Sequence, residues 1–248
     1  MIETDQGLAG RRLAPDQRFN FACGPELACF NACCRDKRLP LLPYDLLRLR
    51  RGLNLPAAAI LEEYVELEID PVSGWPALRI QLTDQGVCPM VSPAGCRVYA
   101  HRPTCCRVYP LARAVRPGVG GPAGGPPQEV FLLQDAPGCL GWDQPRQLSV
   151  AEWIEDQGLA DYQAANNYAL RLLLHPRRRG KVSLNQAQTH AFISALYNLE
   201  AFRSAVQQEG FAARWAVAPT RLAQALSSDE ELLNLGVDWL AGALFGEG

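Results

Sequence analysis

Nine cysteines lie in this chain of 248 residues, all of them between Cys23 and Cys139. They form two spaced sets, each ending in an adjacent pair, and Cys139 follows alone. The first set is Cys23, Cys29, Cys33 and Cys34, and the second is Cys88, Cys96, Cys105 and Cys106. Thiolates gathered in this way bind zinc, iron or an iron–sulfur cluster. The sequence therefore predicts a metal centre in this part of the chain.

Disulfides are the main alternative to metal binding. The first residues, MIETDQGLAGRRLAPDQ, lack the apolar core of a secretory signal peptide, and no run reaches the roughly 18 apolar residues of a membrane span. We therefore expect a cytoplasmic protein without membrane contact, in which thiols stay reduced. The odd number of cysteines would also leave one thiol over in a fully disulfide-bonded chain. Both observations favour a metal over disulfides.

The overall composition is that of an ordinary globular protein, with 48% hydrophobic and 20% charged residues. The net charge of −2 provides no positive surface for nucleic acid, so we expect no such partner. A short basic run, RRRGK at 177–181, is typical of a solvated helix end.

Three regions follow one another along the chain: a polar lead at 1–20, a cysteine-cluster metal-binding region at 21–147, and a helical C-terminal subdomain at 148–248. The predicted fold class is α+β and mostly helical. In this prediction a small irregular cysteine-rich region with a few short strands packs on the helical subdomain.

Local signals place elements in the middle region. Pro43–Gly52 is predicted to be a short helix that stops at its glycine, and Pro56 is predicted to open another. Alternating apolar residues predict strands at Val65–Ile69, Ala77–Leu82 and Glu129–Leu133. The stretch from 116 to 127 is nearly all glycine and proline, which predicts a mobile surface loop.

The C-terminal region carries repeated helix-start signals. Ser149 with Glu152, Ser183 with Gln186, and Ser228 with Glu231 each have the spacing of a capping box. The second of these is predicted to begin one long amphipathic helix that reaches residue 209. A helix over 161–175 is predicted to stop at Pro176.

The spacing of the cysteines leaves the number of sites open. If Cys29 and Cys33 lie on one helical turn, they share a face, and Cys34 then points about 100° away. Nine thiols suit two four-ligand sites with one spare, or one site with several bystanders. Pro103 and Pro110 predict a short turn-bound segment between them rather than a helix.

Other side chains near the cysteines bear on the same site. Arginines beside the thiolates would offset their negative charge, and four flank the two sets: Arg35, Arg97, Arg102 and Arg107. His101 is a candidate mixed ligand, with a plain hydrogen-bonding role as the alternative. His175 and His190 are distant in sequence and are predicted to take no part.

Four segments carry a resemblance to a known family: CFNACCRD at 29–36, LLPYDLLRLR at 41–50, GVCPMVSPAGCRVYAHRPTCCRVYPLAR at 86–113, and FLLQDAPGCLGW at 131–142. On these motifs the chain resembles the YkgJ-like cysteine-cluster family (CxxCxxCC) of zinc- or iron-chelating domain proteins. Two downstream segments, SVAEWIEDQGLADY at 149–162 and LYNLEAFR at 196–203, are similar to the helical tail of its longer members.

The resemblance implies a set of metal ligands: Cys23, Cys29, Cys33, Cys34, Cys88, Cys96, Cys106 and Cys139. Cys105 occupies a position where the family has another residue, which makes it the expected spare. The intervals of five and three residues in the first set depart from the family's two, and this departure puts Cys23 in doubt. The family has no agreed reaction, so the resemblance implies a site and no chemistry beyond it.

Iron, as an iron–sulfur cluster, is the predicted cofactor, with zinc as the alternative. The surplus of thiols and the scarcity of histidine favour iron, and flagellin lysine-N-methylases, which resemble this family locally, carry such a cluster. An enzyme, either methyltransferase-like or acting in thiol redox chemistry, is a second hypothesis, although no GxGxxG, CxxC or catalytic-triad pattern is present. A metal chaperone or sensor is a third.

Overall fold

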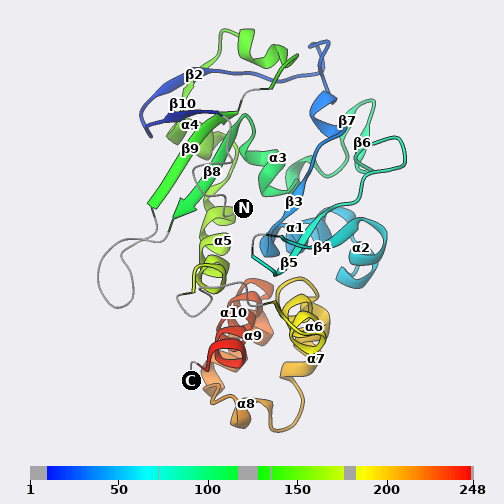
Figure 1. Cartoon of the computed structure of the whole chain (residues 1–248), viewed down its shortest axis with the longest axis vertical. Coiled ribbons are helices and arrows are strands. Elements are labelled where there is room, and N and C mark those ends of the chain that lie inside the picture. The colour runs from blue at the N-terminus through cyan, green and yellow to red at the C-terminus, as the bar shows by residue number, and fades with distance from the viewer. Residues whose placement is uncertain (1–9, 72, 117–127, 135, 176–182, 247–248) are drawn as a thin grey trace. The chain divides into compact units, whose positions relative to one another are not determined.

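The computed structural model of this chain describes residues 10–71, 73–116, 128–134, 136–175 and 183–246 (Figure 1). Of the loop predicted at 116–127, residue 116 ends a strand and residues 117–127 lie outside the described ranges. The basic run 177–181 and the helix stop at Pro176 also lie outside them. The described ranges combine helices with short strands in an α+β fold, the class that the sequence predicts. No helix within these ranges has both the length and the apolar character that crossing a membrane requires.

The chain divides into two compact units, each made of two separate segments. The cysteine unit comprises residues 1–40 and 82–161 and contains all nine cysteines. The helical unit comprises residues 41–81 and 162–248. Residues 41–81, which sequence order alone assigns to the cysteine region, therefore belong to the same unit as the C-terminal helices.

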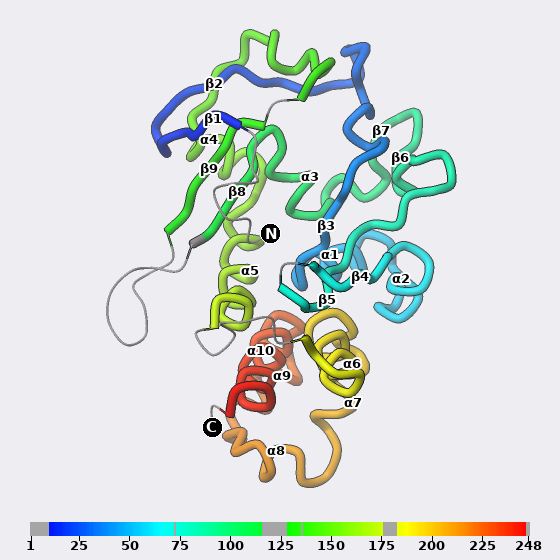
Figure 2. The backbone as a smooth tube through the Cα atoms, viewed as in Figure 1, coloured from blue at the N-terminus to red at the C-terminus, as the bar shows by residue number. Residues whose placement is uncertain are grey.

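The largest sheet of the cysteine unit has three antiparallel strands in the order β1-β9-β8. β9 (Gln128–Gln134) includes the predicted strand at 129–133, and β1 (Gly10–Leu13) and β8 (Leu111–Arg116) pair with it on either side. Figure 2 shows β8 and β9 running side by side. Ala114, Val130 and Leu132 form a buried apolar cluster on this sheet. Neither β1 nor β8 is predicted from the sequence.

The remaining elements of the cysteine unit are short. Two further pairs of strands are antiparallel: β2 (Arg18–Asn20) with β10 (Gln147–Ser149), and β6 (Val91–Ser92) with β7 (Gly95–Cys96). The short helices are η1 (Ala32–Cys34), η2 (Tyr99–His101), α3 (Thr104–Val108), η3 (Leu140–Asp143) and α4 (Val150–Asp156). The capping box predicted at the start of α4 is present, because Ser149 Oγ accepts from the Glu152 N–H while Glu152 accepts from the Ser149 N–H.

The segment 41–81 contributes two helices and a sheet to the helical unit. Asp45 accepts a hydrogen bond of 2.9 Å from the Leu42 N–H and so caps α1 (Pro43–Leu53). This helix passes through Gly52 and ends at Asn54, whose φ of 53° terminates it, so the predicted stop at Gly52 is wrong. The other elements are α2 (Ala57–Glu63), β4 (Val65–Ile69), β5 (Pro76–Ile80) and β3 (Pro40–Leu41), in a sheet of order β3-β5-β4.

The C-terminal segment is helical, as predicted, but the long helix expected from 183 to 209 is two helices. Asn185, rather than Ser183, caps α6 (Gln186–Leu196), and the side chain of Asn198 accepts from the Ala201 N–H to start α7 (Leu199–Val206). Asparagine is a favoured N-cap residue, so a new helix begins at Asn198 although the apolar pattern continues through it. The other helices are α5 (Ala160–Leu173), α8 (Phe211–Arg214), α9 (Pro219–Ser227) and α10 (Asp229–Phe245).

The core of the helical unit is formed around α10, which contacts α1, α6, α7 and α9. Trp75 is buried between rings, edge-on to Phe192 at 5.6 Å and stacked with Phe245 at 6.1 Å between centroids. Leu232 and Leu240 of α10 are fully buried. Apolar helix faces and aromatic rings therefore hold this unit together.

Candidate metal centre

Backbone hydrogen bonds join the two cysteine sets. The Cys88 N–H donates to the Cys34 carbonyl at 2.8 Å, and the Asp36 N–H donates to the Gly86 carbonyl at 2.8 Å. Between them, Arg35 and Val87 form an antiparallel bridge. Gly86 has φ +69°, a left-handed conformation that favours glycine at the turn that brings the sets together.

Cys139 lies with the first set. The Leu140 N–H donates to Cys29 Sγ at 3.2 Å, and the Ala22 N–H donates to the Gly141 carbonyl at 3.1 Å. The pKa of the Cys23 thiol is raised to about 11. Burial is the main cause, and the negative charges that Cys33, Cys29 and Cys139 would carry as thiolates contribute to the same rise. These four residues are electrostatic neighbours and are called here the first thiol group: Cys23, Cys29, Cys33 and Cys139.

A second thiol group is built from the end of η1, the segment before β6, strand β7 and helix α3: Cys34, Cys88, Cys96 and Cys106. Burial raises the pKa of Cys88 to about 11, backbone N–H groups at Met90 and Val91 oppose this, and the charges of Cys106 and Cys96 add to it. The pKa of Cys96 is raised by burial first and by Cys106. Burial thus favours the protonated thiol at Cys88 and Cys96, and a cation that binds them must displace their protons.

Cys33 and Cys34 connect the two groups. The thiol of Cys34 donates to Cys33, which lowers the pKa of Cys33 to about 7, and the positive charges of Lys37 and Arg102 act in the same direction. Holding that hydrogen bond raises the pKa of Cys34, as do its burial and the charge of Cys33 itself. The hydrogen bond thus favours the thiolate at Cys33 and the thiol at Cys34.

Two expectations about local structure are wrong. Cys29 and Cys33 do not share a helical turn, because Asn31 between them has φ 68° and the helix that follows is the 3-10 helix η1. The stretch between Pro103 and Pro110 is not a loop but the helix α3, in which the Arg107 N–H donates to the Pro103 carbonyl at 2.9 Å. Pro103 precedes the first turn, where its missing N–H costs nothing.

Arg102 is the arginine whose charge acts on the thiols. Its guanidinium is buried, lies 3.9 Å from the centroid of the Tyr99 ring and donates to the Tyr99 carbonyl at 3.0 Å. Its charge lowers the pKa of Cys33 and opposes the rise at Cys96. Arg97 and Arg107 instead donate to backbone carbonyls, those of Pro89 at 2.7 Å and Ala100 at 2.8 Å.

An aromatic cluster lies beside the first thiol group. Phe21 packs edge-on against Trp142, Trp153 and Tyr109, with ring centroids 5.2, 5.5 and 5.7 Å away. The pKa of Tyr109 is raised by burial first, and then by its hydrogen bond to Cys139. Sequence reasoning missed Tyr109, although its position three residues after Cys106 was a usable signal.

The donor set fits a soft or borderline metal, although the sulfurs do not meet at one point. All nine cysteines are free thiols. Within the described ranges, which include every cysteine, no three or more His, Cys, Asp or Glu side chains are arranged to hold a metal ion. Each thiol group nevertheless offers four sulfurs, the number that zinc and iron–sulfur clusters take. Cys105 belongs to neither group, and its Sγ lies 3.8 Å from Cys106 Sγ.

The histidines are divided between the units. His175 and His190 belong to the helical unit, where the His175 ring stacks on Phe245 at 4.0 Å. His101 ends η2 in the cysteine unit. The cysteine unit therefore offers sulfur rather than nitrogen as its abundant metal donor.

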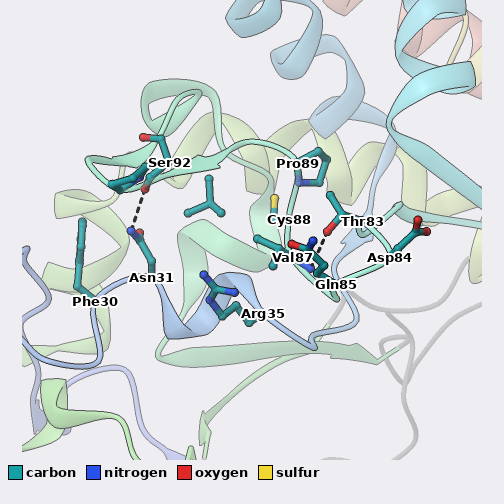
Figure 3. A pocket seen from close by; sticks show the side chains of 12 residues that line it. Phe30, Asn31, Arg35, Thr83, Asp84, Gln85, Val87, Cys88, Pro89 and Ser92 are labelled. Carbon is teal, nitrogen blue, oxygen red and sulfur yellow. Dashed lines mark hydrogen bonds between the residues drawn. The ribbon is translucent and has the colours of Figure 1, made fainter.

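A pocket, which the sequence did not indicate, lies next to the second thiol group (Figure 3). Its volume is about 710 Å³, and Cys88 is part of its wall. Its other residues come from the turn before η1, from Arg35 directly after η1, from the segment between β5 and β6, and from β6 with Pro93 after it.

One comparison with known proteins gives a match. The family model named CxxCxxCC, described as a "putative zinc- or iron-chelating domain", matches residues 22–139, the stretch that contains all nine cysteines. No curated protein and no solved structure matches the chain.

Proposed function

Because residues 22–139 match the model of the CxxCxxCC family of zinc- or iron-chelating domains, we propose that this chain is a cytoplasmic protein that holds iron, as an iron–sulfur cluster, through its cysteines. One observation carries the proposal. Eight thiols from distant parts of the chain lie in one compact unit, where the Cys88 N–H bonds to the Cys34 carbonyl and the Leu140 N–H, next to Cys139, bonds to Cys29 Sγ.

The second thiol group is the stronger proposed site. Backbone hydrogen bonds hold Cys34 to Cys88, and Cys88 is only 7% exposed. Four thiolates around a centre of charge +2 leave an excess of negative charge, which the buried guanidinium of Arg102 offsets. The first thiol group, in which Cys23 and Cys33 are exposed, is the proposed weaker site.

Iron is preferred to zinc because the donors are thiols alone and are more numerous than one tetrahedral ion uses. A bound cluster would supply a covalent cross-link and one-electron redox chemistry. The chain's own contribution is to orient the thiols, to shield them with the cluster of Phe21, Tyr109 and Trp142, and to compensate their charge with Arg102.

The test is metal and sulfide analysis of the full chain purified without oxygen, together with its visible spectrum. A brown protein that contains iron and acid-labile sulfide supports a cluster. If the protein is colourless and contains stoichiometric zinc, the thiol site is supported and its metal is zinc rather than iron. A protein without either metal overturns the proposal.

Neighbouring cysteines on α3 offer a matched pair of variants. Cys106→Ser removes a member of the second thiol group and is expected to abolish metal retention there, whereas Cys105→Ser leaves both groups complete and is expected to retain the metal. Equal metal contents in the two variants would contradict the proposed ligand set.

A metal carrier is the second candidate function, because Cys23 and Cys33 are exposed and a donor on the surface exchanges its metal more readily. Competition with a soluble chelator separates the two functions. Loss of metal from the native protein within minutes favours a carrier, and metal that leaves only on unfolding favours a permanent centre.

A further inference from the structure

The pocket beside the second thiol group combines one unpaired cation with apolar walls. The guanidinium of Arg35 lines it, and no carboxylate among the described residues pairs with this arginine. Asp84 also lines the pocket, but in Figure 3 its carboxylate lies at the far side from the guanidinium. Phe30, Val91 and Pro93 supply the apolar surface.

The frame around this cation is held by specific contacts. The Asn31 side chain donates to the Ser92 carbonyl at 3.0 Å, which ties the turn before η1 to β6 (Figure 3). The backbone bridge between Arg35 and Val87 fixes the base of the arginine. Gly95 lets the hairpin approach closely, since a Cβ there would lie 3.1 Å from the Phe30 ring. The pocket is thus a product of the fold rather than of loose side chains.

Polar hydrogen-bonding groups complete the lining. Thr83 Oγ1 accepts from the Val87 N–H at 3.2 Å, which leaves its hydroxyl hydrogen to donate, and the Gln85 amide lines the same wall. A volume of about 710 Å³ lies within the roughly 300–1,000 Å³ of small-molecule sites. An arginine fork among apolar walls recognises a carboxylate or phosphate attached to an apolar body.

We propose that this pocket binds a small organic anion, with its acidic group on Arg35 and its apolar part against Phe30 and Val91. The bound molecule would lie against the wall that Cys88 forms, at the edge of the second thiol group. Binding of this anion is a separate function from metal binding, because the pocket is formed by contacts between residues of the chain and needs no metal to form.

Titration calorimetry on the full chain, with its metal as purified, tests the pocket. The probes are 3-phenylpropionate, its uncharged analogue 3-phenylpropionamide, phenyl phosphate and acetate. We expect 3-phenylpropionate or phenyl phosphate to bind about tenfold or more tightly than the amide and acetate, because only these acids provide both the charge and the apolar body. The tighter of the two identifies the acidic group.

Two variants give the controls. Arg35→Gln is expected to weaken binding of the acid about tenfold or more, whereas Arg12→Gln removes an exposed positive charge on β1 and is expected to leave it unchanged. Val91→Phe fills the pocket and is expected to abolish binding. Circular dichroism and metal analysis of every variant confirm that the fold and the metal are retained.

Several results would overturn the proposal: no binding of either acid at millimolar concentration, equal binding of acid and amide, or unchanged binding by Arg35→Gln. Failure of the proposed metal site is a separate outcome. If a preparation contains no metal but still binds the acid through Arg35, the proposed metal site is contradicted and the proposed anion pocket is supported.

Discussion

The two units of this protein are stabilised in different ways. In the helical unit, α10 runs for 17 residues and buries Leu232 and Leu240 completely. In the cysteine unit the elements are shorter: β2 has three residues and α3 has five. Each short element buries little apolar surface, so we expect a bound metal to add more to the stability of the cysteine unit than to that of the helical unit.

The cysteine unit does contain apolar packing, but in separate patches. One is the aromatic cluster around Phe21, and another is the cluster of Ala114, Val130 and Leu132 on the three-stranded sheet. The segments that carry the thiols lie between turns. A centre bound by these thiols would connect segments that packing alone holds weakly.

Metal removal is the largest change that tests this contrast. If the protein is purified with metal, a strong chelator is expected to destabilise the cysteine unit by an amount on the order of 10 kcal/mol, the scale of structural metal sites. Hydrogen exchange by mass spectrometry should then show loss of protection in 22–36 and 86–108, while α10 stays protected. Equal loss in both units would contradict the difference between them.

A cavity in the helical core tests the reverse case. Phe202 is 1% exposed and packs against Trp239, with ring centroids 5.4 Å apart. Phe202→Ala is expected to lower the free energy of unfolding of the helical unit by about 3–5 kcal/mol in denaturant titrations, because of the lost burial and the remaining cavity. The metal content of the folded variant should equal that of the wild type, and a lower content would show that the units are coupled.

Two glycines with positive φ, one in each unit, allow a comparison of the same substitution at two turns. Gly86→Ala in the cysteine unit places a Cβ 2.0 Å from Asp36 Oδ1, whereas Gly210→Ala in the helical unit, at φ +83°, meets no atom within 4 Å. The second variant is expected to lose about 1–2 kcal/mol from the left-handed backbone alone. The first should lose a similar amount, since the end of the exposed Asp36 side chain can turn away from the added Cβ, and it should also retain less metal, because this turn joins the two cysteine sets. Thermal unfolding and metal analysis measure the two effects. An unchanged metal content in Gly86→Ala would show that the metal site does not depend on this turn.

Helix caps provide a matched comparison of smaller size. Ser149 caps α4 in the cysteine unit and Ser228 caps α10 in the helical unit, each accepting from the N–H three residues later. Alanine at either position is expected to cost about 1 kcal/mol. Site-resolved hydrogen exchange should locate each loss in the first turn of its own helix. A loss that spreads to the other unit would contradict the division.

The pH dependence at Glu152 is the smallest expected effect. The Ser149 N–H bonds to its carboxylate, and with Arg18 this holds the pKa of Glu152 below its ordinary value of 4.5. A lowered pKa in the folded state stabilises the protein above the ordinary value, and this contribution is lost as pH falls through the folded value. Glu152→Gln should therefore flatten the pH dependence of stability below about pH 4.5, measured by urea unfolding. If the slope of stability against pH is the same in the variant and the wild type, the Glu152 carboxylate does not contribute to the pH dependence.

Local chemistry made much of the fold predictable. The strand at Val65–Ile69 and the capping box at Ser149 depend on residues within a few positions of one another, and the structure contains both. The asparagine caps at Asn185 and Asn198 were missed because serine at 183 offered a competing signal and an uninterrupted apolar pattern continued past both. Strand β8 was missed because its partner β9 lies beyond a glycine- and proline-rich stretch.

The sequence by itself determined that this chain concentrates sulfur donors and offers few nitrogen donors, since residue type alone sets that chemistry. Tertiary structure decided how the two cysteine sets meet, with the Cys88 N–H bonded to the Cys34 carbonyl, and it assigned residues 41–81 to the helical unit. It also made the pocket at Arg35. These outcomes depend on hydrogen bonds and packing between residues more than fifty positions apart, which no local pattern encodes.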